Sequence, residues 1–124
     1  MQELRASLIA CGETDGVLFA SFAEGEEPED FCLHFQRARQ HDEQDRELGM
    51  DTYCLVTNRG TTHYGGVAAA ALGPRQLEVF LTSGAAGRLG IPDSFVIKLA
   101  STPPPELAST LRAVLGAALT ESRL

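Results

Sequence analysis

The chain has 124 residues and a net charge of −7, with 44% hydrophobic and 22% charged residues. Length and composition are those of one globular domain over residues 1–124, which needs neither a metal ion nor a disulfide to fold, and we predict no cofactor. No apolar run approaches the ~20 residues of a membrane-spanning helix, and the acidic start Met1-Gln2-Glu3 is unlike a secretory signal, so we expect a cytoplasmic protein.

The first third of the chain is predicted to form three strands. Alternating apolar residues from Leu4 to Cys11 indicate a half-buried strand, and the turn at 13–16 leads into a hairpin partner over Val17–Ala23. An acidic loop over 24–30, which contains Pro28, comes next. A third strand then places Phe31 on one face and His34 on the other.

The middle of the chain alternates polar loops with short strands. Residues 39–48 are predicted to form a short exposed helix or an ordered loop that ends at Gly49, followed by a fourth strand over 52–58. Residues 61–64 and 67–72 are interpreted as one strand kinked at Gly65-Gly66, where we expect a bulge and a positive φ. A further alternating strand covers Leu77 to Leu81.

The last third adds two helices and a strand. Ser83 is predicted to cap a helix that runs through Leu89 and ends at a left-handed Gly90, and the last strand covers 95–99. The apolar stripe of the final helix consists of Leu107, Leu111, Val114, Leu115 and Ala118. These elements predict an α+β fold: a mainly antiparallel β-meander sheet with a C-terminal amphipathic helix packed on one face. A strand-only sandwich is the alternative.

Few residues in the chain suggest catalysis. Cys11, Cys32 and Cys54 lie in apolar strand patterns without a Cys-x-x-Cys pair, which favours buried, reduced thiols over a metal site. An enzyme would have to use His34 or His63 as the base beside carboxylates of the 42–51 segment, and no nucleophile accompanies either histidine. We therefore predict a protein that is not an enzyme.

The order of several short motifs resembles one known family. Gln36-Arg37 is followed by the segment 43–53, EQDRELGMDTY, and then by Tyr64-Gly65-Gly66-Val67. Downstream come the strand 77–81, Ala85-Ala86, and Leu89-Gly90-Ile91-Pro92. Together these motifs resemble the immunity protein 10 family of bacterial polymorphic toxin systems, from Val17 to the final helix. Phe31, where tyrosine is frequent, and Thr57, near a frequent acid, depart from the pattern and bear on which partner is recognised.

The resemblance implies a small cytoplasmic protein that binds and neutralises a cognate toxin. Residues 1–51 hold 13 carboxylates and 4 basic side chains, a charge of −9, whereas residues 52–124 hold 4 and 6, a charge of +2. Such a field repels nucleic acid and attracts a basic partner, for example a nuclease toxin, although solvated loops that only maintain solubility have the same composition.

Candidate partner-binding residues follow from this charge and from the side chains that dominate interfaces. They are Glu26, Glu27, Glu29, Asp30, Arg37, Asp42, Glu43, Asp45, Glu47, Asp51 and Tyr64. Phe31 and Tyr53 are further aromatic candidates, for which core packing is the alternative. The sequence leaves open whether the protein is a monomer or a homodimer, and a regulatory or structural interaction module remains the alternative function.

Overall fold

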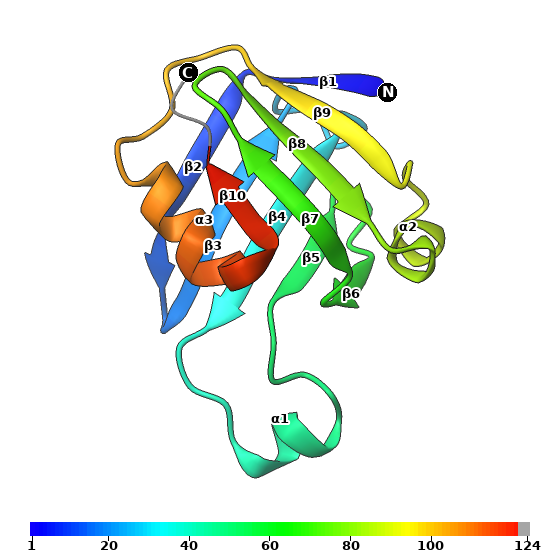
Figure 1. The fold of residues 1–124 in the computed structure, drawn as a ribbon, viewed down its shortest axis with the longest axis vertical. Helices are drawn as coiled ribbons and strands as arrows, with labels where there is room; N and C mark the ends of the chain where they lie inside the picture. Colours follow the sequence, from blue (N-terminus) through cyan, green and yellow to red (C-terminus); the bar gives the residue numbers. More distant parts are fainter. Residues whose placement is uncertain (122–124) are drawn as a thin grey trace.

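The computed structural model describes residues 1–121, which form two five-stranded sheets and three short helices (Figure 1). The strands are β1 (Gln2–Ala6), β2 (Leu8–Thr14), β3 (Val17–Ala23), β4 (Cys32–Ala38), β5 (Cys54–Thr57), β6 (Thr62–Tyr64), β7 (Val67–Leu72), β8 (Gln76–Leu81), β9 (Ser94–Leu99) and β10 (Leu119–Glu121). The helices are α1 (Glu43–Glu47), α2 (Ser83–Leu89) and α3 (Leu107–Leu115), the last followed by a 3₁₀ turn over Gly116–Ala118. None of these helices is long and apolar enough to cross a lipid bilayer.

The two sheets are built differently. Strands β2 to β6 lie side by side in sequence order, all antiparallel, and we call them the meander sheet. The other sheet has the order β1-β9-β8-β7-β10 and is called the mixed sheet, because β1 pairs with β9, and β10 with β7, in parallel. The predicted α+β fold with antiparallel strands and a packed C-terminal helix is confirmed, but its strands form two sheets.

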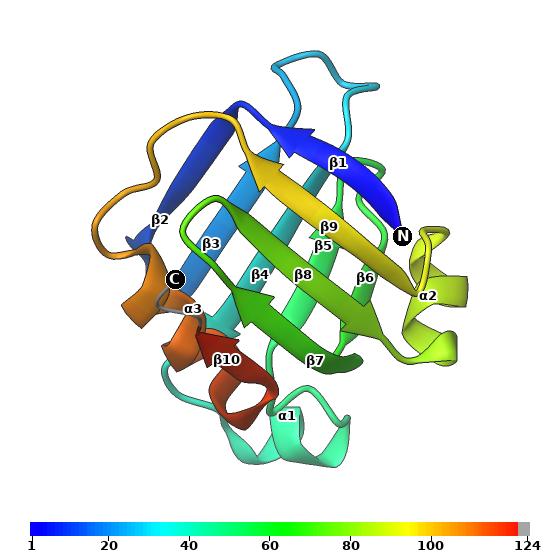
Figure 2. The same ribbon diagram turned by 45° about the horizontal axis from the view of Figure 1, so that its top comes forward.

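The core lies between the two sheets, whose strands cross steeply in Figure 2. Phe22 and Phe35 of the meander sheet are at most 1% exposed and meet edge to face, with ring centroids 5.9 Å apart. Leu111 and Val114 of α3 are fully buried beside them, as the helical stripe predicts. Burying these side chains contributes roughly 1.5–3 kcal/mol each before conformational entropy is counted. Helix α3 thus closes one side of the sandwich (Figure 2).

The predicted strand from Leu4 to Cys11 is wrong, because the chain changes sheets at Ser7. Strand β1 belongs to the mixed sheet and β2 to the meander sheet, and the Ser7 amide donates to the carbonyl of Ala23 over 2.9 Å. Ala6 is 2% exposed, whereas Leu8 is 43% exposed. The alternating sequence pattern continues through Ser7, but the inward and outward positions exchange there, so Leu8 faces solvent although Ala6 faces the core. A shift of one residue in strand register has the same effect.

The Gly65-Gly66 pair also joins the two sheets, so the single kinked strand predicted around it is wrong. Strand β6 ends in the meander sheet and β7 begins in the mixed sheet. The predicted positive φ is confirmed, with +70° at Gly65 and +97° at Gly66. Tyr53 fixes this crossing, because its hydroxyl accepts from the Val67 amide at 2.8 Å and its carbonyl accepts from the Gly65 amide at 2.8 Å.

Smaller differences concern the ends of helices and the cysteines. Thr82 caps α2 in place of Ser83, since its Oγ1 accepts from the Ala85 amide at 3.2 Å, while Gly90 ends the helix in the predicted left-handed conformation at φ +70°. The sequence did not predict β10, and Ala118 lies in the 3₁₀ turn and not on the helix face. All three cysteines are free as expected, but they are only partly buried.

Candidate functional site

The two acidic loops lie at opposite ends of the meander sheet. The β3–β4 loop, residues 24–31, enters β4, and the α1 loop, residues 39–53, leaves it. Because seven extended residues separate them, the loops are about 23 Å apart along the strand. Figure 2 shows the β3–β4 loop at the top of the molecule and α1 at the bottom. A partner that contacts both loops must therefore extend along the sheet.

The α1 loop is held in shape by two of its own acids. Asp42 Oδ1 accepts from the Asp45 amide at 2.7 Å, and Asp45 Oδ2 accepts from the Asp42 amide at 3.1 Å. This capping box satisfies amide groups that the first helical turn leaves unpaired. Glu43, Glu47 and Asp51 are exposed, and they form no ion pair within residues 1–121. The loop thus presents three free carboxylates on a defined backbone.

In the β3–β4 loop, too, one acid holds the backbone while others remain exposed. Asp30 is partly buried, and its Oδ2 accepts from the Glu27 amide at 3.1 Å while its own amide donates to the Glu27 carbonyl at 3.0 Å. Asn58 Nδ2 donates to the Pro28 carbonyl at 3.2 Å and ties the loop to the β5–β6 turn. The side chains of Glu26, Glu27 and Glu29 remain exposed.

A small hollow of about 190 Å³ forms where the α1 loop meets the meander sheet. Among its lining residues are Arg37, Asp45 and Tyr64, so the structure brings together three residues that the sequence predicted separately. Tyr64 is 39% exposed, and burial raises its pKa, with smaller contributions from the charges of Cys54 and Asp45. Arg37 also has a structural contact, since its Nη1 donates to the Val114 carbonyl at the end of α3 over 3.0 Å.

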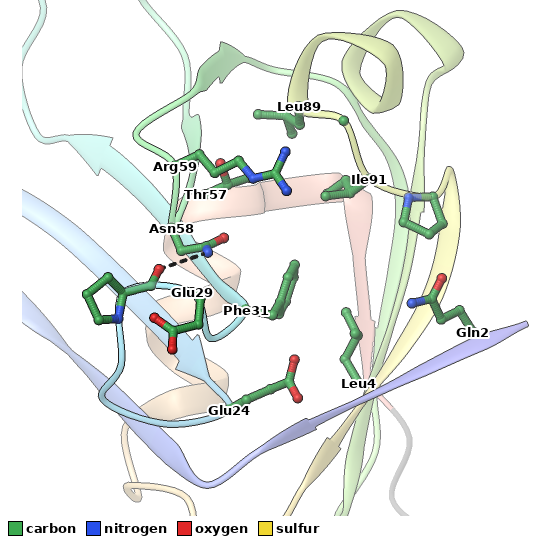
Figure 3. Close-up of a pocket in the computed structure, with 13 residues that line it drawn as sticks. Gln2, Leu4, Glu24, Glu29, Phe31, Thr57, Asn58, Arg59, Leu89 and Ile91 are labelled. Carbon is green, nitrogen blue, oxygen red and sulfur yellow. Dashed lines mark hydrogen bonds between the residues drawn. The ribbon is translucent and has the colours of Figure 1, made fainter.

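A larger cleft of about 450 Å³ opens at the other end, between the β3–β4 loop, the β5–β6 turn and the segment after α2 (Figure 3). Phe31 lies against this cleft and packs edge to face on Phe95 at 6.4 Å. Glu29 and Arg59 lie around it (Figure 3). Thr57 is 4% exposed and its Oγ1 has no hydrogen-bond partner among residues 1–121, an uncommon state for a buried hydroxyl.

The two further aromatic candidates have different surroundings. Tyr53 is 9% exposed and holds the crossing between the sheets, so it belongs to the core. Phe31 is partly buried and remains reachable from the cleft. Of the aromatic candidates, Tyr64 and Phe31 are therefore the two that a partner can touch.

The outward side of the meander sheet carries no charged residue, and we call it the neutral face. One row across the five strands consists of Ala10, Ser21, His34, Val56 and Thr62. The next row consists of Gly12, Phe19, Gln36, Cys54 and Tyr64. The shorter outer rows are Leu8-Ala23-Cys32 and Thr14-Val17-Ala38. None of these positions is buried.

The sequence reasoning missed the neutral face, although a signal for it exists. The strand Val17–Ala23, VLFASFA, contains no charge at any position, which is typical of a strand covered on both faces. Its inward residues Ala20 and Phe22 are indeed at most 1% exposed, but the outward ones are only partly buried. The strand thus has the uncharged composition of a doubly covered strand and one face that residues 1–121 leave partly exposed.

Within residues 1–121, His34 and His63 form no hydrogen bond or ion pair with the carboxylates of the 42–51 segment that an enzyme would have to use. His34 Nδ1 lies 2.6 Å from Ser21 Oγ, and its Nε2 lies 3.4 Å from Cys32 Sγ. Burial lowers the pKa of His34 and raises the pKa of the Cys32 thiol, so both groups favour their neutral forms and a reactive thiolate is disfavoured. His63 Nδ1 lies 3.1 Å from the Gly65 carbonyl, and no His, Cys, Asp or Glu cluster within residues 1–121 could hold a metal ion.

A small α+β domain with two ordered acidic loops at the ends of an open sheet is suited to bind another protein. The family model described as Immunity protein 10 matches residues 5–108, and the chain therefore belongs to this family. The match includes both acidic loops and the whole neutral face. Comparison with curated proteins and with solved structures gave no match. Family membership makes this an immunity protein that neutralises a toxin, as the resemblance implied.

Proposed function

We propose that this immunity protein binds its cognate toxin directly in the cytoplasm and occludes the toxin's active site with its acidic loops. The observation that carries the proposal is the set of six exposed carboxylates without ion pairs within residues 1–121: Glu26, Glu27, Glu29, Glu43, Glu47 and Asp51. Ordered loops reduce the conformational entropy that binding would otherwise cost.

The charge of these loops fits a basic toxin surface. A nuclease binds phosphate through lysine and arginine side chains, and carboxylates can pair with the same side chains. Complementary charge raises the association rate, which falls as salt screens the field. We therefore propose a nuclease domain as the partner class, from a polymorphic toxin system.

The test compares charge reversals that leave the loop backbones intact. One variant carries Glu43→Lys, Glu47→Lys and Asp51→Lys, and a second carries Glu26→Lys, Glu27→Lys and Glu29→Lys. Asp30, Asp42 and Asp45 are unchanged, because they bond to loop amides. A control with the same change in net charge carries Glu3→Lys, Glu78→Lys and Glu106→Lys, away from both loops.

The assays are survival of cells that co-express the toxin and association kinetics at several salt concentrations. We expect the association rate constants of the loop variants to be lower by roughly 10-fold or more and to depend less on salt, while the control remains close to wild type. If wild type neither binds nor rescues, direct binding is wrong. If binding persists and both loop variants match the control, the acidic loops are not the recognition surface.

A further inference from the structure

We propose that the cognate toxin lies across the neutral face of the meander sheet, with basic side chains that reach the acidic loop at each end. This inference rests on the proposed function and specifies its interface. The toxin surface that fits would be flat and mainly uncharged at its centre, with lysines or arginines on opposite margins.

The two outer faces of the sandwich differ in charge. The outer face of the mixed sheet is charged, with Glu3, Arg5, Glu78 and Lys98 at paired positions. The neutral face has no Asp, Glu, Lys or Arg at any outward position, in a chain that contains 27 such residues. An open sheet face usually carries polar and charged side chains, and the centre of a protein interface is depleted in charge.

A few large apolar side chains remain exposed. Within residues 1–121 they are Met1, Leu8, Leu48 and Tyr64. Leu8 and Tyr64 belong to edge strands of the neutral face, and Leu48 follows α1 at 62% exposure. The face and the α1 loop are continuous, because Gln36, Cys54 and Tyr64 line the same hollow as Asp45. Apolar surface therefore adjoins acidic surface directly.

The area of the neutral face and the charge of its flanking loops bear on which occupant fits. At about 3.4 Å per residue and 4.8 Å between strands, the neutral face covers on the order of 450 Å². A stable complex buries roughly 800 Å² on each partner, so the flanking loops must contribute. Each loop contains five carboxylates. A second copy packed face to face with its strands aligned, parallel or antiparallel, would bring acid against acid at both ends, whereas a basic toxin brings opposite charge to both.

The first experiment measures toxin binding by a variant that separates contact from charge steering. Ala10 is an exposed residue of the neutral face, and Ala69 is an exposed residue of β7 on the outer face of the mixed sheet. Ala10→Glu adds negative charge to an acidic protein, so steering alone would leave or improve binding to a basic toxin. We expect Ala10→Glu to weaken binding about 10-fold or more, mainly through faster dissociation, because a buried unpaired charge is costly. Ala69→Glu should remain within about twofold of wild type.

The second experiment uses the wild-type cysteines as reporters. Cys32 and Cys54 lie on the neutral face, whereas Cys11 faces α3 from the inward side and lines a separate open cleft. Maleimide labelling with and without bound toxin, read by peptide mass spectrometry, needs no substitution. Toxin should slow labelling of Cys32 and Cys54 about 10-fold or more and leave Cys11 unchanged.

The outcomes distinguish this inference from the proposed function. If wild type binds toxin but Ala10→Glu binds equally well and Cys32 and Cys54 label at the free rate, the toxin binds elsewhere and this inference is wrong. If the immunity protein alone forms a dimer in sedimentation that Ala10→Glu dissociates, the face belongs to a second copy and the inference is again wrong. Failure of wild type to bind toxin would instead overturn the proposed function itself.

Discussion

The glycine pair between the two sheets allows a quantitative test of the sandwich. Replacing Gly66 with alanine adds a Cβ only 2.5 Å from the Cβ of Ala85 and 2.9 Å from His63 Nδ1, at φ +97°. Two carbon atoms pack at about 3.5–4.0 Å, so α2 or the β6 end must move by an ångström or more. Left-handed strain costs roughly 1–2 kcal/mol and overpacking roughly 1–3 kcal/mol. The expected loss is therefore about 2–5 kcal/mol of unfolding free energy.

The neighbouring glycine is the matched control. A Cβ on Gly65 would lie 3.9 Å from the nearest atom, at φ +70°, so Gly65→Ala has only the backbone strain of about 1–2 kcal/mol. Gly65→Asn should cost less than Gly65→Ala, because asparagine tolerates the left-handed region. Guanidinium unfolding followed by far-UV circular dichroism measures all three. Equal losses at the two positions, or a larger loss for Gly65→Ala, would refute the close approach of β6 and α2.

Three further predictions concern single side chains. Thr57→Val keeps the shape of the residue but removes the unpaired buried hydroxyl, so it should raise the unfolding free energy by about 1 kcal/mol; a loss would show that Oγ1 has a partner. Burial lowers the pKa of His34 below its ordinary 6.5, so as the pH falls His34 is protonated in the unfolded chain before it is protonated in the folded one. The unfolding free energy should therefore fall as the pH drops below about 6.5. Denaturant unfolding at pH 7.5 and 5.5 should show a smaller fall for His34→Gln, and an equal fall would contradict the assignment. Asp42→Ala should increase amide exchange in α1, whereas Glu43→Ala should not, since only Asp42 caps the helix; equal exchange in both would argue against the capping box.

Local patterns in the sequence predicted most single elements correctly but not their assignment to sheets. The alternation from Leu77 to Leu81 identified β8, and Gly90 marked the end of α2, because each signal depends only on neighbouring residues. The changes of sheet at Ser7 and at Gly65-Gly66 depend on which distant strand is paired, and alternation continues through the first of them. Strand β10 has three residues, too few to show a period, and it depends on pairing with β7.

The candidate site was predictable to a similar extent. Runs of carboxylates identified both acidic loops, since exposed charge is evident from composition alone. The separation of the loops needed the position of β4 between them. The sequence could not predict that four of the candidate residues have structural roles, because these roles depend on hydrogen bonds with backbone groups. They are Asp30, Asp42, Asp45 and Arg37. The neutral face was not predicted, because Cys32, Val56 and Phe19 are as apolar as core residues. Only the strand register shows that they point outward.

The sequential order of the meander sheet bears on how soon the protein can act after synthesis. Residues 8–64 contain all five of its strands and both acidic loops, and every pairing joins neighbouring strands through a local connection. Completing the mixed sheet instead requires β1 to pair with β9 and β7 to pair with β10, and contacts between residues so far apart in the sequence form slowly. We expect the meander sheet to take shape first and docking of the mixed sheet and α3 to limit the folding rate. The time needed to protect the cell would then depend on strands that lie outside the proposed toxin contact.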